Sequence, residues 1–185
     1  MEARTYGLGS ETYRAVKALY LSAFPPEQRY CPEALWLTGL LRSRTENLAW
    51  FDDSRLAGMT YTVDTGRNLY IYYIAVDPAL RSRGYGSAIL DCLRQRHPDR
   101  VLILDVDAPD PESPAYETQL RRVDFYLRNG FHALDHHVIT EGKRLDILST
   151  SEDFDASEYW RAFKLMSQPM LARLKGLQKR LGIWK

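Results

Sequence analysis

The sequence lacks a long hydrophobic run. Its longest unbroken stretch of apolar and aromatic residues covers residues 69–76, whereas a helix that crosses a membrane needs about 20 such residues. The first four residues do not begin the basic and then apolar segment that a secretory signal peptide requires. We therefore expect neither a membrane span nor a signal peptide.

Cysteine is scarce. Cys31 and Cys92 are the only two cysteines, and neither has the neighbouring ligands at the spacing that is typical of a zinc site. This scarcity excludes a disulfide scaffold, predicts no metal site and favours a reducing, cytoplasmic setting. Neither thiol has a base beside it in the sequence, so we expect neither to carry an acyl group.

Acidic residues are missing from the C-terminal end. Residues 161–185 contain seven basic residues and no acidic one, whereas residues 1–160 have a net charge of −6. From residue 155 onward, apolar residues recur every three or four positions, which is typical of an amphipathic helix. We expect this helix to pack on the acidic body or to form a homodimer surface. A membrane surface or nucleic acid is the alternative, and nucleic acid is not the expected partner.

The rest of the chain alternates between strand and helix patterns. Short apolar runs bounded by turn residues predict strands, and apolar residues at spacings of three and four predict helices. Strands, a helix, a strand, a helix and further strands follow one another, which is typical of a mixed α/β layered fold. The predicted helices are 12–24, 32–41, 86–96 and about 120–128, and the predicted strands are 47–51, 56–63, 69–76, 101–106, 131–140 and 145–150.

The most informative segment is the loop at residues 81–87, which joins a strand to a helix. Gly84 and Gly86 let backbone amides come close to a ligand, and the helix that follows offers unpaired N–H groups and the positive end of its dipole. With Arg81 and Arg83, these features describe a pyrophosphate cradle. The alternative is a turn that needs glycine only for its backbone angles.

Two motifs in this order carry a family resemblance. Arg81, Gly84 and Gly86 match the pattern Arg/Gln-x-x-Gly-x-Gly/Ala, and residues 125–131 match the pattern Phe-Tyr-x-x-x-Gly-Phe. Together with the order of elements over residues 1–150, they resemble the GCN5-related N-acetyltransferase (GNAT) superfamily. The resemblance implies a mixed, mostly antiparallel central sheet that is flanked by helices.

The resemblance also implies a division of the chain and a cosubstrate. Residues 1–150 would form the acetyltransferase domain, and residues 151–185 an amphipathic, basic helical extension. Acetyl-CoA would be the cosubstrate, with its thioester in a gap between the strands 69–76 and 101–106, and no metal would take part. The residues implied to bind acetyl-CoA are Ile74, Ala75, Val76, Arg81, Arg83, Gly84, Tyr85, Gly86 and Ser87.

The family match makes Tyr126 the candidate general acid, because a phenol with a pKa of about 10 is protonated at neutral pH and can donate to the departing thiolate. The alternative is a packed structural tyrosine. A base is harder to assign. Many family members have a glutamate on the strand that reads Tyr-Ile-Tyr-Tyr-Ile at residues 70–74, and this sequence has none. Glu27 is the preferred carboxylate, and ordered water or a relay through Tyr72 and Tyr73 are the alternatives.

The acceptor is expected to be a primary amine that attacks the thioester directly in a ternary complex. Asp105 and Asp107, at the end of the strand 101–106, and Tyr72 are candidate substrate-binding residues. Residues 107–117 form an acidic, proline-rich loop that would favour a small, cationic acceptor; a merely solvated insertion is the alternative. A non-catalytic acyl-CoA sensor or interaction protein is the alternative function.

Overall fold

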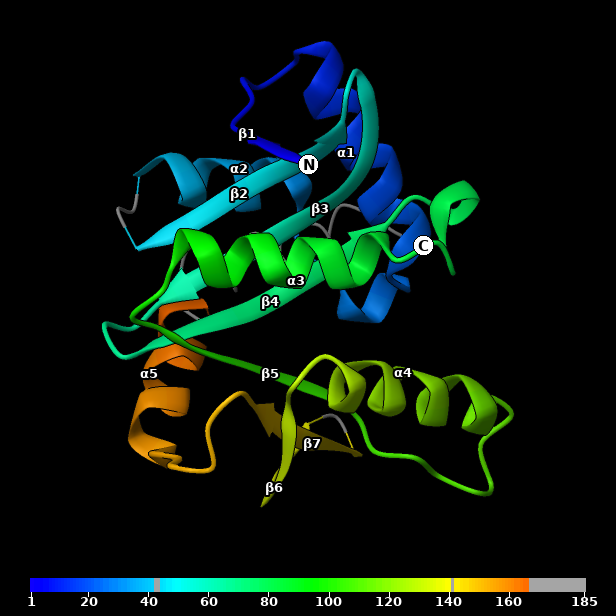
Figure 1. Cartoon of the computed structure of the whole chain (residues 1–185), viewed down its shortest axis with the longest axis vertical. Helices are drawn as coiled ribbons and strands as arrows, with labels where there is room; N and C mark the ends of the chain where they lie inside the picture. The colour runs from blue at the N-terminus through cyan, green and yellow to red at the C-terminus, as the bar shows by residue number, and fades with distance from the viewer. Residues whose placement is uncertain (42–43, 141, 167–185) are drawn as a thin grey trace, which may run out of the picture.

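The computed structural model describes residues 1–41, 44–140 and 142–166. The strands within these residues form one sheet in the order β1-β2-β3-β4-β5-β7-β6 (Figure 1). Most neighbouring strands are antiparallel, as the sequence predicts, and only β4 and β5 pair in parallel. The strands are β1 (Glu2–Arg4), β2 (Thr45–Asp52), β3 (Arg55–Asp64), β4 (Asn68–Val76), β5 (Val101–Asp107), β6 (His132–Thr140) and β7 (Lys143–Ser149).

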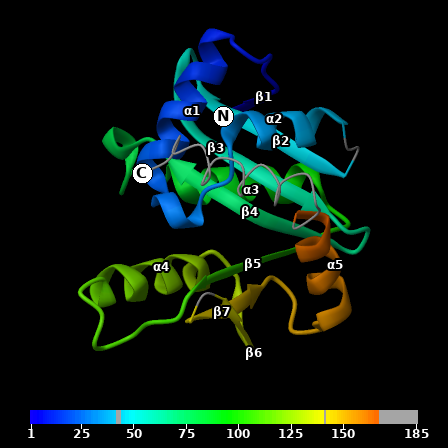
Figure 2. The ribbon, with the colours of Figure 1, turned by 180° about the vertical axis from the view of Figure 1, so that it is seen from behind.

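Helices cover both faces of this sheet. The helices α3 and α4 pack on one face, and α1, α2 and α5 pack on the other (Figures 1 and 2). Each face therefore has its own apolar core, which buries side chains from the strands between them. The helices are α1 (Glu11–Ala23), α2 (Pro32–Leu41), α3 (Tyr85–Arg96), α4 (Tyr116–Arg128) and α5 (Ala156–Met166), with the 3₁₀ turns η1 (Pro26–Gln28) and η2 (Pro78–Leu80).

The sheet opens between β4 and β5. These strands pair only over Asn68–Val101, Leu69–Leu102 and Tyr70–Ile103. Beyond this point β4 stays paired with β3 as far as Val76, while β5 pairs with β7. The first residues of β4 are buried on both faces, as expected, but from residue 72 onward every second side chain is only half-buried. The predicted gap between the two strands is therefore present.

Local signals explain most helix ends. The hydroxyl of Ser10 accepts a hydrogen bond from the backbone N–H of Tyr13 and caps α1, and Pro25 and Pro26 follow the last turn of α1. Gly84 precedes α3 in the left-handed region, with φ of 84°. The sequence analysis missed β1 and both 3₁₀ turns, since segments of three residues carry almost no periodic signal.

The prediction for α4 needs two corrections. The acidic segment was expected to be a loop as far as residue 117, but α4 already begins at Tyr116. The helical spacing of Leu120, Val123 and Leu127 predicts that these three form the buried stripe, but Leu127 is 42% exposed, and Tyr126 is buried in its place. The buried face is thus turned by about one residue, because two aromatic side chains, Phe125 and Tyr126, pack into the core that α3 and α4 share.

The C-terminal segment is described only in part. Its first helix, α5, is amphipathic as predicted, and Tyr159 and Ala162 are buried in the core that contains α1 and α2. The basic stretch 167–185 lies outside the described residues. Within the described ranges, no helix is both long and apolar enough to span a membrane.

Candidate active site

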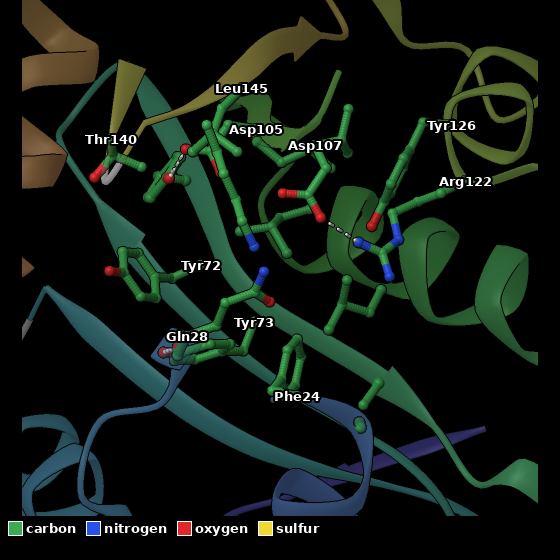
Figure 3. A pocket seen from close by; sticks show the side chains of 18 of the residues that line it. Phe24, Gln28, Tyr72, Tyr73, Asp105, Asp107, Arg122, Tyr126, Thr140 and Leu145 are labelled. Atoms are coloured by element: carbon green, nitrogen blue, oxygen red, sulfur yellow. Dashed lines mark hydrogen bonds and ion pairs between the residues drawn. The ribbon is translucent and has the colours of Figure 1, made fainter. Parts of the chain in front are cut away.

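The gap between β4 and β5 opens into a cavity of about 560 Å³. In Figure 3, Tyr126 and Arg122 of α4 lie on one side of it and Tyr72 on the other, with Asp105 and Asp107 of β5 between them. The end of α1, η1, the β6–β7 hairpin and α5 contribute further walls. Volumes of this size are typical of small-molecule sites.

The loop that precedes α3 opens at the same end of β4. Arg81 lines the cavity. Within the described chain, the first intrahelical bond of α3 runs from the N–H of Ala88 to the carbonyl of Gly84, so the N–H groups of residues 85–87 in its first turn have no acceptor inside the helix. Ser82 and Gly84 both have positive φ values, of 59° and 84°. Successive free N–H groups at a helix N-terminus form an anion-binding site.

The other predicted loop residues have different surroundings. Tyr85 turns its hydroxyl to Asp52 at the tip of the β2–β3 hairpin and donates a 2.6 Å hydrogen bond to Oδ2. Arg83 is exposed. Arg83, Gly84, Tyr85, Gly86 and Ser87 do not line the cavity, whereas Ile74, Ala75 and Val76 do. Beyond Tyr70, the edge of β4 that faces β5 has no partner strand within the described chain.

Tyr126 is 7% exposed, and it lines the cavity. Its ring packs against Phe125 and Phe131, while its hydroxyl has no hydrogen-bond partner in the part of the chain that the structure describes. Burial raises the pKa of Tyr126 to about 12, and the nearby Arg122 offsets this only in part. The phenol is therefore protonated at neutral pH, as a proton donor must be.

Asp105 belongs to β5 and lines the cavity between Tyr70 and α5. Its Oδ2 accepts hydrogen bonds from Tyr70 Oη at 2.5 Å and from Tyr159 Oη at 2.8 Å. Its Oδ1 accepts none from the described residues. Burial raises the pKa of the Asp105 carboxyl, and the two phenols lower it in part. Two hydrogen bonds thus hold the Asp105 carboxylate in place through Oδ2, and Oδ1 is available to a ligand.

The remaining predicted site residues differ in whether another side chain already binds them. Asp107 lies 3.7 Å from Arg122 and forms an ion pair with it. Glu27 is exposed on η1 and contributes to the rim of the cavity. Tyr72 is half-buried and donates a 3.3 Å hydrogen bond to Tyr30 Oη. Asp107 is the only acidic residue of the segment 107–117 that lines the cavity.

Several site residues were missed by the sequence analysis. Phe163 of α5 and Arg122 of α4 line the cavity, and Tyr159 of α5 reaches the site through its hydrogen bond to Asp105. No sequence motif marks the two residues of α5, because they follow both family motifs and approach the site only through the packing of α5. The positive charge of Arg122 one turn before Tyr126 is the one signal that was available.

Neither thiol forms a disulfide. Within the described residues, no group of three or more His, Cys, Asp or Glu side chains could hold a metal ion. Cys31 lies in the link between η1 and α2, where its Sγ is 3.1 Å from Glu33 Oε2. Partial burial, and then the hydrogen bond to Glu33, raise the pKa of this thiol.

Comparison with known sequences decides the family. The profile of the Acetyltransferase (GNAT) family matches residues 13–131. The chain belongs to the GNAT acetyltransferase family. The peptidyl-lysine N-acetyltransferase YiaC of Escherichia coli (strain K12) is 30% identical to it over 93 residues, which are 50% of this chain and 54% of YiaC. The similarity thus spans only about half the length of that relative.

Solved structures of GNAT proteins have the same fold. A protein of Bacteroides thetaiotaomicron described as a GNAT acetyltransferase superposes with a TM-score of 0.73 at 24% identity, over 90% of this chain and 97% of that one. An aminoglycoside 6'-N-acetyltransferase complexed with coenzyme A gives 0.62 at 13% identity, over 84% and 99%. A variant of the spermidine N-acetyltransferase SpeG of Vibrio cholerae gives 0.61 at 14%, over 82% and 95%. At these sequence identities, the similarity to the solved structures shows a shared fold only.

Proposed function

We propose that this GNAT protein is an acetyl-CoA-dependent N-acetyltransferase that acts on a primary amine bound in the cavity between β4 and β5. The supporting observation is that one cavity joins Arg81 of the loop before α3, the unpaired edge of β4, and the side chains of Tyr126 and Asp105. Acetyl-CoA supplies an activated acetyl thioester, and the chain supplies binding, orientation and proton transfer.

The chain's own groups fit this cosubstrate. The N–H groups of residues 85–87 in the first turn of α3 and the guanidinium groups of Arg81 and Arg83 suit a pyrophosphate. Gly84, the N-cap of α3, has the left-handed backbone that lets the chain turn into this helix. Along β4, the open edge at residues 74–76 offers main-chain groups to an amide-containing arm, as in the addition of a strand. Tyr85 fixes the loop through Asp52.

Tyr126 is proposed as the general acid. When the amine nitrogen bonds to the acetyl carbon and the carbon–sulfur bond breaks, a proton on Tyr126 Oη can pass to the departing thiolate. The raised pKa of about 12 keeps that proton in place at neutral pH, and the hydroxyl has no competing partner among the described residues. General acid catalysis of this kind contributes about 100-fold or more.

Two carboxylates are candidates for the amine proton. Glu27, favoured by sequence, is exposed at the rim. Asp105 is inside the cavity, and Oδ1 is open to a protonated amine. Because burial raises its pKa, Asp105 is a stronger base than an exposed carboxylate. We therefore propose that Asp105 binds the amine and takes its proton, with Tyr72 beside it, and that Glu27 or ordered water is the alternative base.

The first test is a thermal melt with acetyl-CoA. Ligand at 100 times its dissociation constant stabilises the folded state by about 2.7 kcal/mol, which raises Tm by several degrees in a chain of this size. Gly84→Glu should weaken the shift. Gly9→Glu is the matched control, because Gly9 also has a positive φ and open space at its Cβ position. No shift at millimolar acetyl-CoA would refute the proposal.

A non-catalytic acyl-CoA sensor is the alternative. Such a sensor would bind acetyl-CoA through the same loop but would not transfer the acetyl group. We would then expect a full thermal shift and no acetylated amine. Release of CoA thiol with a panel of amines, corrected for hydrolysis, separates the two functions. A protein lysine is the second candidate acceptor, since YiaC is a peptidyl-lysine N-acetyltransferase.

The organisation of the chain is part of the proposal. Residues 1–150 would form the acetyltransferase domain and residues 151–185 the extension, of which α5 is packed in the core. The extension is a candidate homodimer surface. Two unpaired cysteines support a reducing compartment such as the cytoplasm.

A further inference from the structure

The acceptor side of the cavity has an aromatic wall. Four aromatic side chains are half-buried and line it: Phe24 after α1, Tyr30 before α2, Tyr72 on β4 and Phe163 on α5. These residues come from four separate segments, and the rings of Tyr30 and Tyr72 pack together with their centroids 5.9 Å apart. Phe163 lies outside the family match, which ends at residue 131.

The phenols in this wall and next to it already have partners. Tyr72 Oη donates to Tyr30 Oη, and Tyr73 Oη donates to the carbonyl of Gln28 at 2.6 Å. The hydroxyls of Tyr70 and Tyr159 are committed to Asp105 Oδ2. The surface that remains for an acceptor is therefore mainly ring faces, which favour flat apolar groups.

The charged side chains of the cavity offer one interior site for a positively charged group. Its acidic side chains are Glu27, Asp105 and Asp107, and its basic side chains are Arg81, Arg122 and Lys143. Asp107 is neutralised by Arg122, and Glu27 is exposed at the rim. Asp105 Oδ1 is thus the one interior anchor for an ammonium group in the described cavity. A second or third positive charge would meet the basic side chains of Arg81, Arg122 or Lys143 and no further interior carboxylate without a partner in the described cavity.

We infer that the acceptor is a small molecule with a single primary amine on a short chain attached to a flat, aromatic body, and that Phe163 of α5 helps to select it. The amine lies against Asp105 Oδ1, and the aromatic body lies against the wall of Phe24, Tyr30, Tyr72 and Phe163. Polyamines and aminoglycosides, which carry several amines, are excluded as preferred acceptors. This inference rests on the proposed transferase function.

The test compares acceptors at saturating acetyl-CoA. The panel contains 2-phenylethylamine, butylamine, spermidine and a peptide with one lysine, and the release of CoA thiol gives kcat/KM for each. We expect kcat/KM for 2-phenylethylamine to exceed the other values by about tenfold. A higher value for spermidine, butylamine or the peptide would overturn the inference while leaving the transferase function intact. Binding of acetyl-CoA without transfer to any amine would refute the proposed function itself.

Variants of α5 test the role of the wall. Phe163→Ala should raise KM for 2-phenylethylamine about fivefold and leave butylamine almost unchanged, so that the preference shrinks. Phe163→Leu, which keeps most of the volume but removes the flat face, should act in the same direction if the alanine variant folds poorly. Lys164→Ala is the matched control, since Lys164 is exposed on the same helix and does not line the cavity. An unchanged preference in both Phe163 variants would overturn the role of Phe163.

Discussion

Gly86 and Phe125 are in direct contact, although they belong to different family motifs. A Cβ atom placed on Gly86 would lie 2.9 Å from Phe125 Cζ, closer than real Cβ contacts. The first turn of α3 therefore packs against the Phe125 ring of α4 with no room for a methyl group. This contact is a physical reason for the two motifs to occur together, because the glycine that opens α3 also accommodates the ring beside the candidate acid.

We expect Gly86→Ala to lower the free energy of unfolding by about 1 kcal/mol. Overpacking costs about 1–3 kcal/mol, and the better helix propensity of alanine offsets about 1 kcal/mol of it. Urea unfolding measures the change. Phe125→Leu in the same chain should relieve the clash, so the double variant should be less destabilised than the sum of the single variants. Ser87→Ala, at the next position of α3, is the control. If the effects of Gly86→Ala and Phe125→Leu on the unfolding free energy add fully, the contact is contradicted.

Tyr126→Phe should lower kcat about 100-fold and change the dissociation constant of acetyl-CoA by less than about twofold. The variant keeps the ring, which packs on Phe125 and Phe131, and removes only the proton donor. Single-turnover kinetics and calorimetric binding measure the two effects. Tyr116→Phe, at the start of the same helix and outside the cavity lining, is the control.

The pH dependence gives a second test of Tyr126. Because burial raises its pKa to about 12, the wild-type enzyme should show no descending limb of kcat from this group below about pH 11. A descending limb near pH 9 that disappears in Tyr126→Phe would mean that the phenol is less buried during turnover than in this structure.

Tyr159→Phe should shift the ascending limb of the pH–rate profile to higher pH. Burial raises the pKa of Asp105, and the hydrogen bonds from Tyr70 and Tyr159 hold it lower than burial alone would. Removing one donor raises the pKa of Asp105 further, because the ionised carboxylate loses a hydrogen bond that favours it. The proton acceptor then ionises at a higher pH.

The control for this shift is Tyr13→Phe. It removes a similar 2.8 Å bond between a phenol and a carboxylate, at Glu33, outside the cavity lining. Its pH–rate profile should match the wild type. An unshifted limb in Tyr159→Phe would leave Asp105 as a binding group and move the proton acceptor elsewhere, for example to Glu27.

The sequence was most informative where local chemistry determines the structure. Glycines and arginines at residues 81–86 predicted the loop before α3, and the apolar run 69–76 predicted β4 as a buried strand. The same run could not show where β4 separates from β5, since beyond the pair Tyr70–Ile103 each strand stays paired only with the neighbour on its other side, β3 or β7. Pairing between distant strands leaves no periodic signal in either one.

The acceptor side of the site was largely invisible in the sequence. Tyr159 donates to Asp105 across 54 positions of the chain, and Phe163 enters the cavity only because α5 packs against the sheet. The buried face of α4 also differs from the one that the apolar spacing predicts. Periodicity alone does not show whether Leu127 or Tyr126 is buried, and the ring of Tyr126 is buried because it packs beside Phe131. Long-range packing decides both cases.

Glu33→Gln should reduce stability at neutral pH but much less in acid. Burial alone would raise the pKa of Glu33, but hydrogen bonds from Lys17, Cys31 and Tyr13 lower it to about 2. A lowered pKa contributes stability that is complete above the unfolded value of about 4.5 and is lost as the pH falls toward 2. Since the side chain is 44% exposed, we discount the effect to about 1 kcal/mol at pH 7.

Urea unfolding of Glu33→Gln and the wild type at several pH values between 7 and 2.5 measures this contribution. The difference in unfolding free energy should be constant above about pH 5.5 and should shrink steadily below it, because protonation of the unfolded chain then offsets the loss of the carboxylate. Glu112→Gln is the control, as Glu112 is exposed and its side chain contacts no partner among the described residues. A difference that stays constant down to pH 2.5 would show that Glu33 contributes through packing of the link between η1 and α2 and not through its charge.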